Sequence, residues 1–156
     1  MELRNELIEC FARGIETPLD DADFDRLARA SFAYQFEQNQ PYAAFCRARG
    51  KTPETVAHWS EIPAIPTAAF KEIDLTTVAP EQVRVTYFTS GTTHANEKRG
   101  RHLLPGTELY DASLAPNFKA HLLPDVERIR VLVFGPSAEC YPHSSLGHMN
   151  SRVLER

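Results

Sequence analysis

Residues 83–93 are Val-Arg-Val-Thr-Tyr-Phe-Thr-Ser-Gly-Thr-Thr, a strand pattern that runs directly into a glycine-containing loop. The first six of these residues are rich in β-formers, and Val83, Val85 and Tyr87 alternate onto one face. The last five offer backbone N–H groups and hydroxyls, while Gly91 has no β-carbon to obstruct an approaching phosphate. We therefore expect a strand followed by a loop that can wrap a polyphosphate.

The candidate phosphate-binding residues are Thr89, Ser90, Gly91, Thr92, Thr93 and Lys98. A Walker A loop is excluded because residues 94–98 are His-Ala-Asn-Glu-Lys, and that motif needs a second glycine followed by lysine and a hydroxyl residue. Lys98 adds positive charge that can reach the same phosphates, as do Arg99 and Arg101. The alternative is an ordinary solvated turn, since turns favour the same small and polar residues.

Helical spacing of apolar residues precedes the strand. It predicts one helix from Leu3 to Gly14 and a second after the start signal Asp20-Asp21. Pro41 suits the first turn of a third helix, and Gly50 suits its left-handed end. Further along, Thr67 is expected to cap a short helix, and Trp59 is expected in the core.

Two more elements are expected after the loop. A helix capped by Thr107 carries Tyr110, Leu114 and Phe118, with a break or restart at Pro116. The apolar run 129–134 predicts a buried strand. The fold class is thus α/β, with a helical lead-in over about 1–72 and an α/β portion that contains the loop over about 83–156. Two strands make an incomplete sheet, so the chain is expected to be the front part of a larger domain.

Composition narrows the functional class. The chain has 156 residues, of which 42% are hydrophobic and 24% charged, as in a soluble globular domain. A net charge of −4 disfavours a nucleic-acid partner, and no run reaches the roughly 18 apolar residues of a membrane span. The three cysteines are widely spaced and odd in number, which indicates free thiols and a cytoplasmic location.

Four segments occur in an order that points to one family. They are residues 61–71 (Glu-Ile-Pro-Ala-Ile-Pro-Thr-Ala-Ala-Phe-Lys), 87–93, 99–102 (Arg-Gly-Arg-His) and 144–149 (Ser-Ser-Leu-Gly-His-Met). Together they resemble the LuxE-type acyl-protein synthetases of the adenylate-forming superfamily, which is related to phenylacetate-CoA ligases and acyl-CoA synthetases. Two positions depart from the family pattern: His94 stands where a glycine usually follows, and Lys98 is only an approximate counterpart of the basic residue that closes the loop.

The resemblance implies an adenylate-forming N-terminal domain and a ligase that uses ATP and Mg²⁺ to convert a fatty acid to an acyl-adenylate. The acyl group then passes to a protein thiol. In luminescent systems this family works with acyl-transferase and acyl-reductase subunits in a fatty-acid reductase complex that serves bioluminescence. The family also has a C-terminal half, which we expect to be missing from this chain, and none of the three cysteines matches its acyl acceptor.

A second group of residues is assigned to the rim of the substrate site by the same resemblance: His143, Ser144, Ser145, Gly147 and His148. The spacing of the two histidines is not that of H-E-x-x-H, and neither a third metal ligand nor an acid that would orient a histidine is evident. We therefore expect no metal site from protein ligands. The alternative to a ligase fragment is a non-catalytic remnant or a partner-binding fragment without activity of its own.

Overall fold

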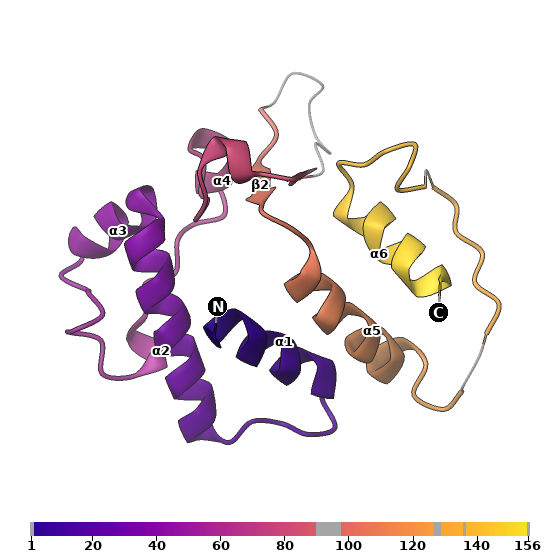
Figure 1. The fold of residues 1–156 in the computed structure, drawn as a ribbon, viewed down its shortest axis with the longest axis horizontal. Helices are drawn as coiled ribbons and strands as arrows, with labels where there is room; N and C mark the ends of the chain where they lie inside the picture. The colour runs from indigo at the N-terminus through magenta and orange to yellow at the C-terminus, as the bar shows by residue number, and fades with distance from the viewer. Residues whose placement is uncertain (1, 90–97, 127–128, 136, 156) are drawn as a thin grey trace. The chain divides into compact units, whose positions relative to one another are not determined.

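A computed structural model of the chain describes residues 2–89, 98–126, 129–135 and 137–155. Its residues fall into two compact units. Residues 19–106 form one unit, and residues 1–18 together with 107–156 form the other. Helices α1 to α6 and strand β2 are labelled in Figure 1.

The unit formed by residues 19–106 begins with helices and ends with a β-hairpin. In chain order its elements are α2 (Asp21–Gln38), α3 (Gln40–Arg47), the 3₁₀ helix η1 (Trp59–Glu61), α4 (Ala69–Glu72), the 3₁₀ helix η2 (Pro80–Gln82), β1 (Val85–Phe88) and β2 (Arg101–Leu104). Mixed helix and a small antiparallel sheet are therefore the architecture of the described residues.

Side-chain caps fix where α2 and α3 begin. The Asp20 carboxylate accepts a hydrogen bond from the backbone N–H of Asp23 at 2.8 Å. Asn39 does the same for the N–H of Tyr42 at 3.2 Å. Each cap satisfies a backbone donor that has no partner inside its helix. The predicted starts of both helices are confirmed, and Gly50 follows α3 with a positive φ of 65°.

The core of this unit lies where α2, α3 and the segment after α3 meet. Its buried centre is Phe32, Cys46 and Val56. Partly buried residues pack around that centre: Phe36, Tyr42, Phe45 and Ile62. The prediction that Trp59 belongs to the core is wrong, because its side chain is 42% exposed and makes an edge-to-face contact with the similarly exposed Phe24, with ring centroids 5.3 Å apart.

The hairpin joins the predicted strand to one that the sequence did not reveal. β1 covers the last four residues of the predicted strand and pairs antiparallel with β2, so that Tyr87 lies opposite His102 and Phe88 opposite Arg101. β2 is Arg-His-Leu-Leu, which has neither β-branched residues nor a clear alternation. Pairing with β1, rather than its own propensity, makes this segment a strand.

The other unit is helical. It contains α1 (Glu2–Arg13), α5 (Glu108–Leu122) and α6 (Ser145–Leu154), with α1 and α6 each packed against α5 (Figure 1). The predicted break at Pro116 does not occur, because α5 continues through it. Gly14, at φ +71°, lies so close to α5 that an added β-carbon would be 2.9 Å from Cβ of Pro116.

Thr107 is the N-cap residue of α5, as expected, but its side chain does not cap the backbone. Its hydroxyl instead donates to the Asp111 carboxylate at 2.9 Å. Thr67 likewise does not cap α4, which begins at Ala69 after Ala68 without a side-chain cap.

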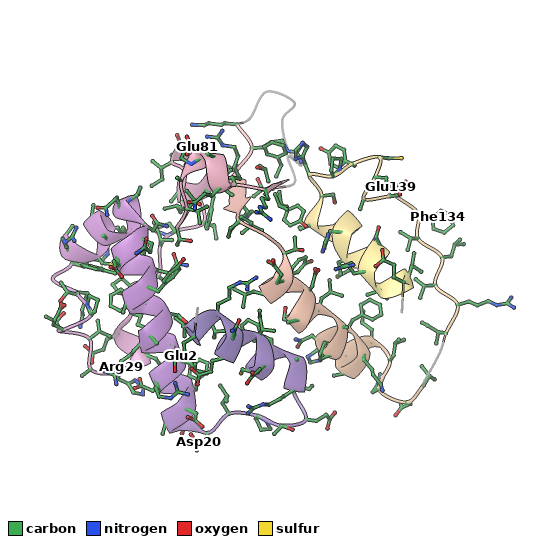
Figure 2. The ribbon with its side chains drawn as sticks, viewed as in Figure 1. Glu2, Asp20, Arg29, Glu81, Phe134 and Glu139 are labelled. Carbon is green, nitrogen blue, oxygen red and sulfur yellow. The ribbon has the colours of Figure 1, made fainter. Side chains whose placement is uncertain are left out.

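The prediction of a buried strand over residues 129–134 is wrong. This segment is irregular, and all of its side chains except the partly buried Val133 are exposed, with Leu132 at 77% and Phe134 at 92% (Figure 2). A short apolar run becomes a strand only where a neighbouring strand offers hydrogen bonds, and the two strands of the described residues pair with each other instead. None of the helices in the described part of the chain has the length and apolar character needed to cross a membrane.

Candidate functional site

The ends of the candidate phosphate loop are joined by a short hydrogen-bonded stem. The backbone N–H of Thr89 donates to the carbonyl of Gly100 at 2.9 Å, and the N–H of Gly100 donates to the Thr89 hydroxyl at 2.9 Å. Arg99 Nε donates to the Thr89 carbonyl at 2.8 Å. Thr89 is thus fixed by three hydrogen bonds immediately beyond the β1–β2 ladder, and its hydroxyl serves the stem.

The remaining candidate loop residues, Ser90, Gly91, Thr92 and Thr93, lie outside the described residues. The structure describes the base of the loop, which is formed by Thr89 and Gly100.

Gly100, on the returning side of this stem, lies where an added β-carbon would be tightly packed. A β-carbon added to Gly100 would lie 3.0 Å from Cγ2 of Thr89 and 3.3 Å from Cβ of Phe70. Both neighbours are held in place, Thr89 by its stem bonds and Phe70 by a contact with His102 whose ring centroids are 4.6 Å apart. Because Gly100 has no β-carbon, α4 and the stem can approach each other closely.

The cations next to the loop have different roles. Arg101 forms an ion pair with Asp74 at 2.7 Å, and Arg99 binds the Thr89 carbonyl, so both serve the stem. Lys98 is more loosely held: its Nζ is 3.5 Å from the Glu72 carbonyl and 3.8 Å from the Glu72 carboxylate. Its side chain is 61% exposed. Of the three, Lys98 is best placed to reach an anion above the stem.

The structure brings together three of the four segments that carried the family resemblance. Phe70, from the segment 61–71, contacts His102 from the segment 99–102, and both adjoin the stem at Thr89. The fourth segment, 144–149, belongs to the other unit.

In that other unit, the predicted rim residues form the start of α6. The Ser144 hydroxyl accepts a hydrogen bond from the Gly147 N–H at 3.0 Å and so caps the helix, while Gly147 itself is buried. Ser145 is the first helical residue, and its carbonyl accepts from the Tyr110 hydroxyl at 3.2 Å. His143 lies in the turn just before α6. The Ser144 hydroxyl is thus used as a cap, which argues against a role as nucleophile.

His148 contacts an acid that the sequence did not reveal. Its Nε2 lies 2.6 Å from Oδ1 of Asp111 on α5, so the expectation that no acid orients this histidine is wrong. The Tyr110 ring stacks on the imidazole with centroids 5.7 Å apart. Asp111 is 37 positions from His148 in sequence, and no local spacing connects the two residues. Only the packing of α6 on α5 brings them together.

Asp111 is the centre of a polar cluster rather than the partner of one histidine. It also accepts hydrogen bonds from Thr107 at 2.9 Å and from Arg152 at 3.0 Å. Burial alone would raise the pKa of Asp111, but the hydrogen bonds from Arg152, His148 and Thr107 together lower it below its ordinary value. The carboxylate is therefore held ionised, and it fastens α6 to α5.

Two further features of the site chemistry concern metals and thiols. The described residues contain no group of three or more histidine, cysteine, aspartate or glutamate side chains arranged to hold a metal ion. All three cysteines are free: Cys46 is buried, Cys10 is partly buried and Cys140 is exposed.

Comparison of the chain with protein-family models, with curated proteins and with solved structures finds no match.

Proposed function

We propose that the protein carrying this chain activates a fatty acid with ATP and transfers the acyl group to a protein thiol. One observation carries the proposal: the segment Thr89–Thr93 leaves directly from β1, and its base is fixed by the hydrogen bonds between Thr89 and Gly100. A loop that binds phosphate through backbone N–H groups benefits from such a base, because preorganised donors need not be reorganised when the ligand arrives.

The proposed reaction has two steps. In the first, a carboxylate oxygen of the fatty acid attacks the α-phosphorus of ATP, a new O–P bond forms, and the bond to pyrophosphate breaks. In the second, a thiolate attacks the acyl carbon, the thioester forms, and AMP leaves with the electrons of the broken C–O bond. The first step concentrates negative charge on the phosphate oxygens, so its rate depends on nearby positive charge and hydrogen-bond donors.

The residues proposed for that role are the loop residues Thr89, Ser90, Gly91, Thr92 and Thr93, together with Lys98. Their amides and hydroxyls would hold the phosphates, and the exposed Lys98 ammonium would neutralise charge. Mg²⁺ would arrive bound to the ATP phosphates and supply further neutralisation, in keeping with an ion that binds through few protein ligands.

The wider assignments are proposals of the same kind. By its resemblance the protein would work in the cytoplasm with acyl-transferase and acyl-reductase subunits of a fatty-acid reductase complex. The residues 143–148 would lie at the rim of the substrate site, where the α5–α6 cluster around Asp111 would hold them in place.

The test is exchange of labelled pyrophosphate into ATP in the presence of a long-chain fatty acid, using the protein as expressed from its own gene. We expect exchange that requires the fatty acid, and we expect Gly91→Val to abolish it because the added side chain obstructs the phosphates. Gly135→Val is the matched control, since Gly135 has no heavy atom within 4 Å of an added β-carbon. Equal exchange by the wild type and Gly91→Val would refute the loop assignment, and no exchange by the wild type would favour the non-catalytic alternative.

A further inference from the structure

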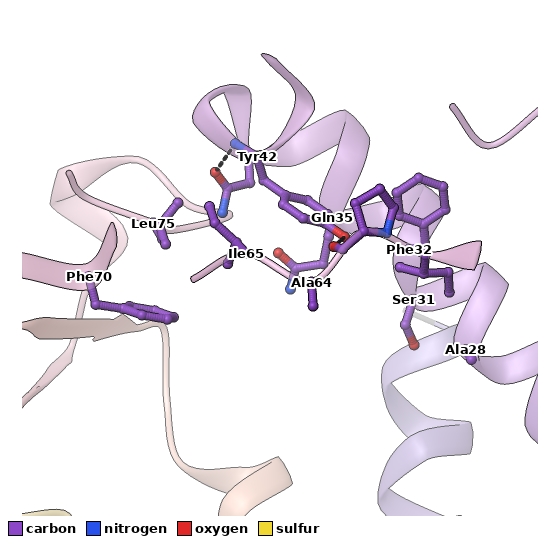
Figure 3. A pocket seen from close by; sticks show the side chains of 12 residues that line it. Ala28, Ser31, Phe32, Gln35, Tyr42, Ala64, Ile65, Phe70 and Leu75 are labelled. Atoms are coloured by element: carbon purple, nitrogen blue, oxygen red, sulfur yellow. Dashed lines mark hydrogen bonds between the residues drawn. The ribbon is translucent and has the colours of Figure 1, made fainter. Parts of the chain in front are cut away.

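A pocket of about 430 Å³ lies within the unit formed by residues 19–106 (Figure 3). One wall is a face of α2, and the other is the extended segment 62–65. Phe70 and Leu75 close one end. Its volume falls within the roughly 300–1,000 Å³ that is usual for small-molecule sites.

The walls are fixed without a ligand. The Tyr42 hydroxyl donates to the Pro63 carbonyl at 2.8 Å and so ties α3 to the opposite wall. The Tyr42 ring meets Phe32 edge-on, with centroids 6.1 Å apart, and Phe32 belongs to the buried core. Burial raises the pKa of the Tyr42 phenol, which keeps this hydroxyl a donor at all ordinary pH values. A preformed pocket avoids the entropic cost of ordering its own walls when a ligand binds.

The lining chemistry selects the ligand. Most of the lining is apolar, and none of the described lining residues carries a charge. Two lining residues on the same face of α2 are polar, Ser31 and Gln35, and no described residue hydrogen-bonds to their side chains. Gln35 is exposed, so a carboxylate, phosphate or ammonium group placed here would lose only part of its water, but it would gain no opposite charge from the lining, which makes its binding unfavourable. A hydroxyl or amide would instead find two hydrogen-bonding partners.

We propose that this pocket binds a linear aliphatic molecule with an uncharged polar end, the chain lying against Phe32, Ile65 and Leu75 and the polar end at Ser31 and Gln35. None of the residues proposed to bind ATP is among the described lining residues, and binding to the pocket requires neither ATP nor Mg²⁺.

The test is calorimetric titration of the chain with 1-hexanol, 1-heptanol and 1-octanol. Each additional methylene buried in the pocket should lower Kd about fourfold. Sodium octanoate at neutral pH should bind at least about tenfold more weakly than 1-octanol, because no lining cation pairs with it. A Kd that does not change with chain length, or octanoate binding as tight as that of octanol, would overturn the proposal.

Pocket-filling variants locate the site. Ala28→Phe places a ring in the pocket from α2 and should weaken 1-octanol binding at least about tenfold, while Gln38→Phe, on the same helix but outside the lining, should leave Kd unchanged. Ser31→Leu is the second filling variant, should Ala28→Phe fail to fold as judged by circular dichroism. Unchanged octanol binding in the folded filling variant would contradict the proposal. Because the titration contains no ATP, its outcome is independent of pyrophosphate exchange.

Discussion

Replacing Asp111 with asparagine tests the cluster that holds α6 on α5. The substitution keeps the shape of the side chain but removes its charge, and Asp111 accepts hydrogen bonds from Thr107, His148 and Arg152. A hydrogen bond to a charged group is worth about 1.5–3 kcal/mol when buried. The Asp111 side chain is 18% exposed, so solvent screens part of this energy, and asparagine can still accept one bond. We therefore expect Asp111→Asn to lower the free energy of opening α6 by about 2 kcal/mol.

The assay is amide hydrogen exchange of α6, which reports the opening of this helix alone. A loss of about 2 kcal/mol corresponds to roughly 30-fold faster exchange at neutral pH. Asp125→Asn is the matched control, because Asp125 is exposed and an exposed substitution of this kind changes stability by less than about 0.5 kcal/mol. Exchange of the α6 amides at the wild-type rate in Asp111→Asn would refute the role given to the cluster.

The stabilisation of α6 by Asp111 should also depend on pH. The pKa of Asp111 in the folded protein lies below its ordinary value of 3.8, so the unfolded chain takes up the proton first as pH falls. The stabilisation by Asp111 is therefore complete above about pH 4 and is lost as the pH falls through the lower, folded pKa. The difference in α6 protection between wild type and Asp111→Asn should shrink in that acidic range. A difference that persists unchanged at pH 2 would contradict the assigned ionisation.

Four further substitutions are tested by urea unfolding. Gly14→Ala should cost about 2–4 kcal/mol, because it combines a positive φ with a steric clash, whereas Gly50→Ala should cost only the backbone term of about 1–2 kcal/mol; equal losses would argue against the clash. Tyr42→Phe removes the hydrogen bond to Pro63 and should cost about 1 kcal/mol, and no loss would mean that this bond does not fix the pocket wall. Phe134→Ser should change the free energy of unfolding by less than about 0.5 kcal/mol, since the ring is 92% exposed. A large loss would mean that Phe134 is buried, as the predicted strand over residues 129–134 requires.

Local signals in the sequence were sufficient for several elements. The caps of α2 and α3, the positive φ of Gly50 and the strand before the loop all depend on residues close together in the chain. Their physics is local, because a cap or a turn is satisfied within a few residues.

Features that depend on distant partners were not predictable in the same way. β2 forms because β1 lies beside it, and the apolar run 129–134 stays irregular among the described residues. Pro116 predicts a break or restart of the helix, yet α5 continues through it while packed against α1.

The candidate site likewise combines features with a local sequence signal and features that depend on distant partners. The position of Thr89 at the end of β1 follows from the strand pattern, whereas helix α6 and the capping role of Ser144 were not predicted. The contact of His148 with Asp111 and the uncharged pocket beside α2 arise from tertiary packing alone. No spacing in the sequence marks either of them.

The most direct test of the proposed adenylation is the identity of the nucleotide product. The protein is incubated with ATP, Mg²⁺, a long-chain fatty acid and hydroxylamine, which traps an activated acyl group as its hydroxamate. We expect one AMP and one pyrophosphate for each hydroxamate, with none formed by Gly91→Val. Release of ADP and phosphate in place of AMP and pyrophosphate would contradict the proposed adenylation, since that outcome means attack at the γ-phosphorus rather than at the α-phosphorus.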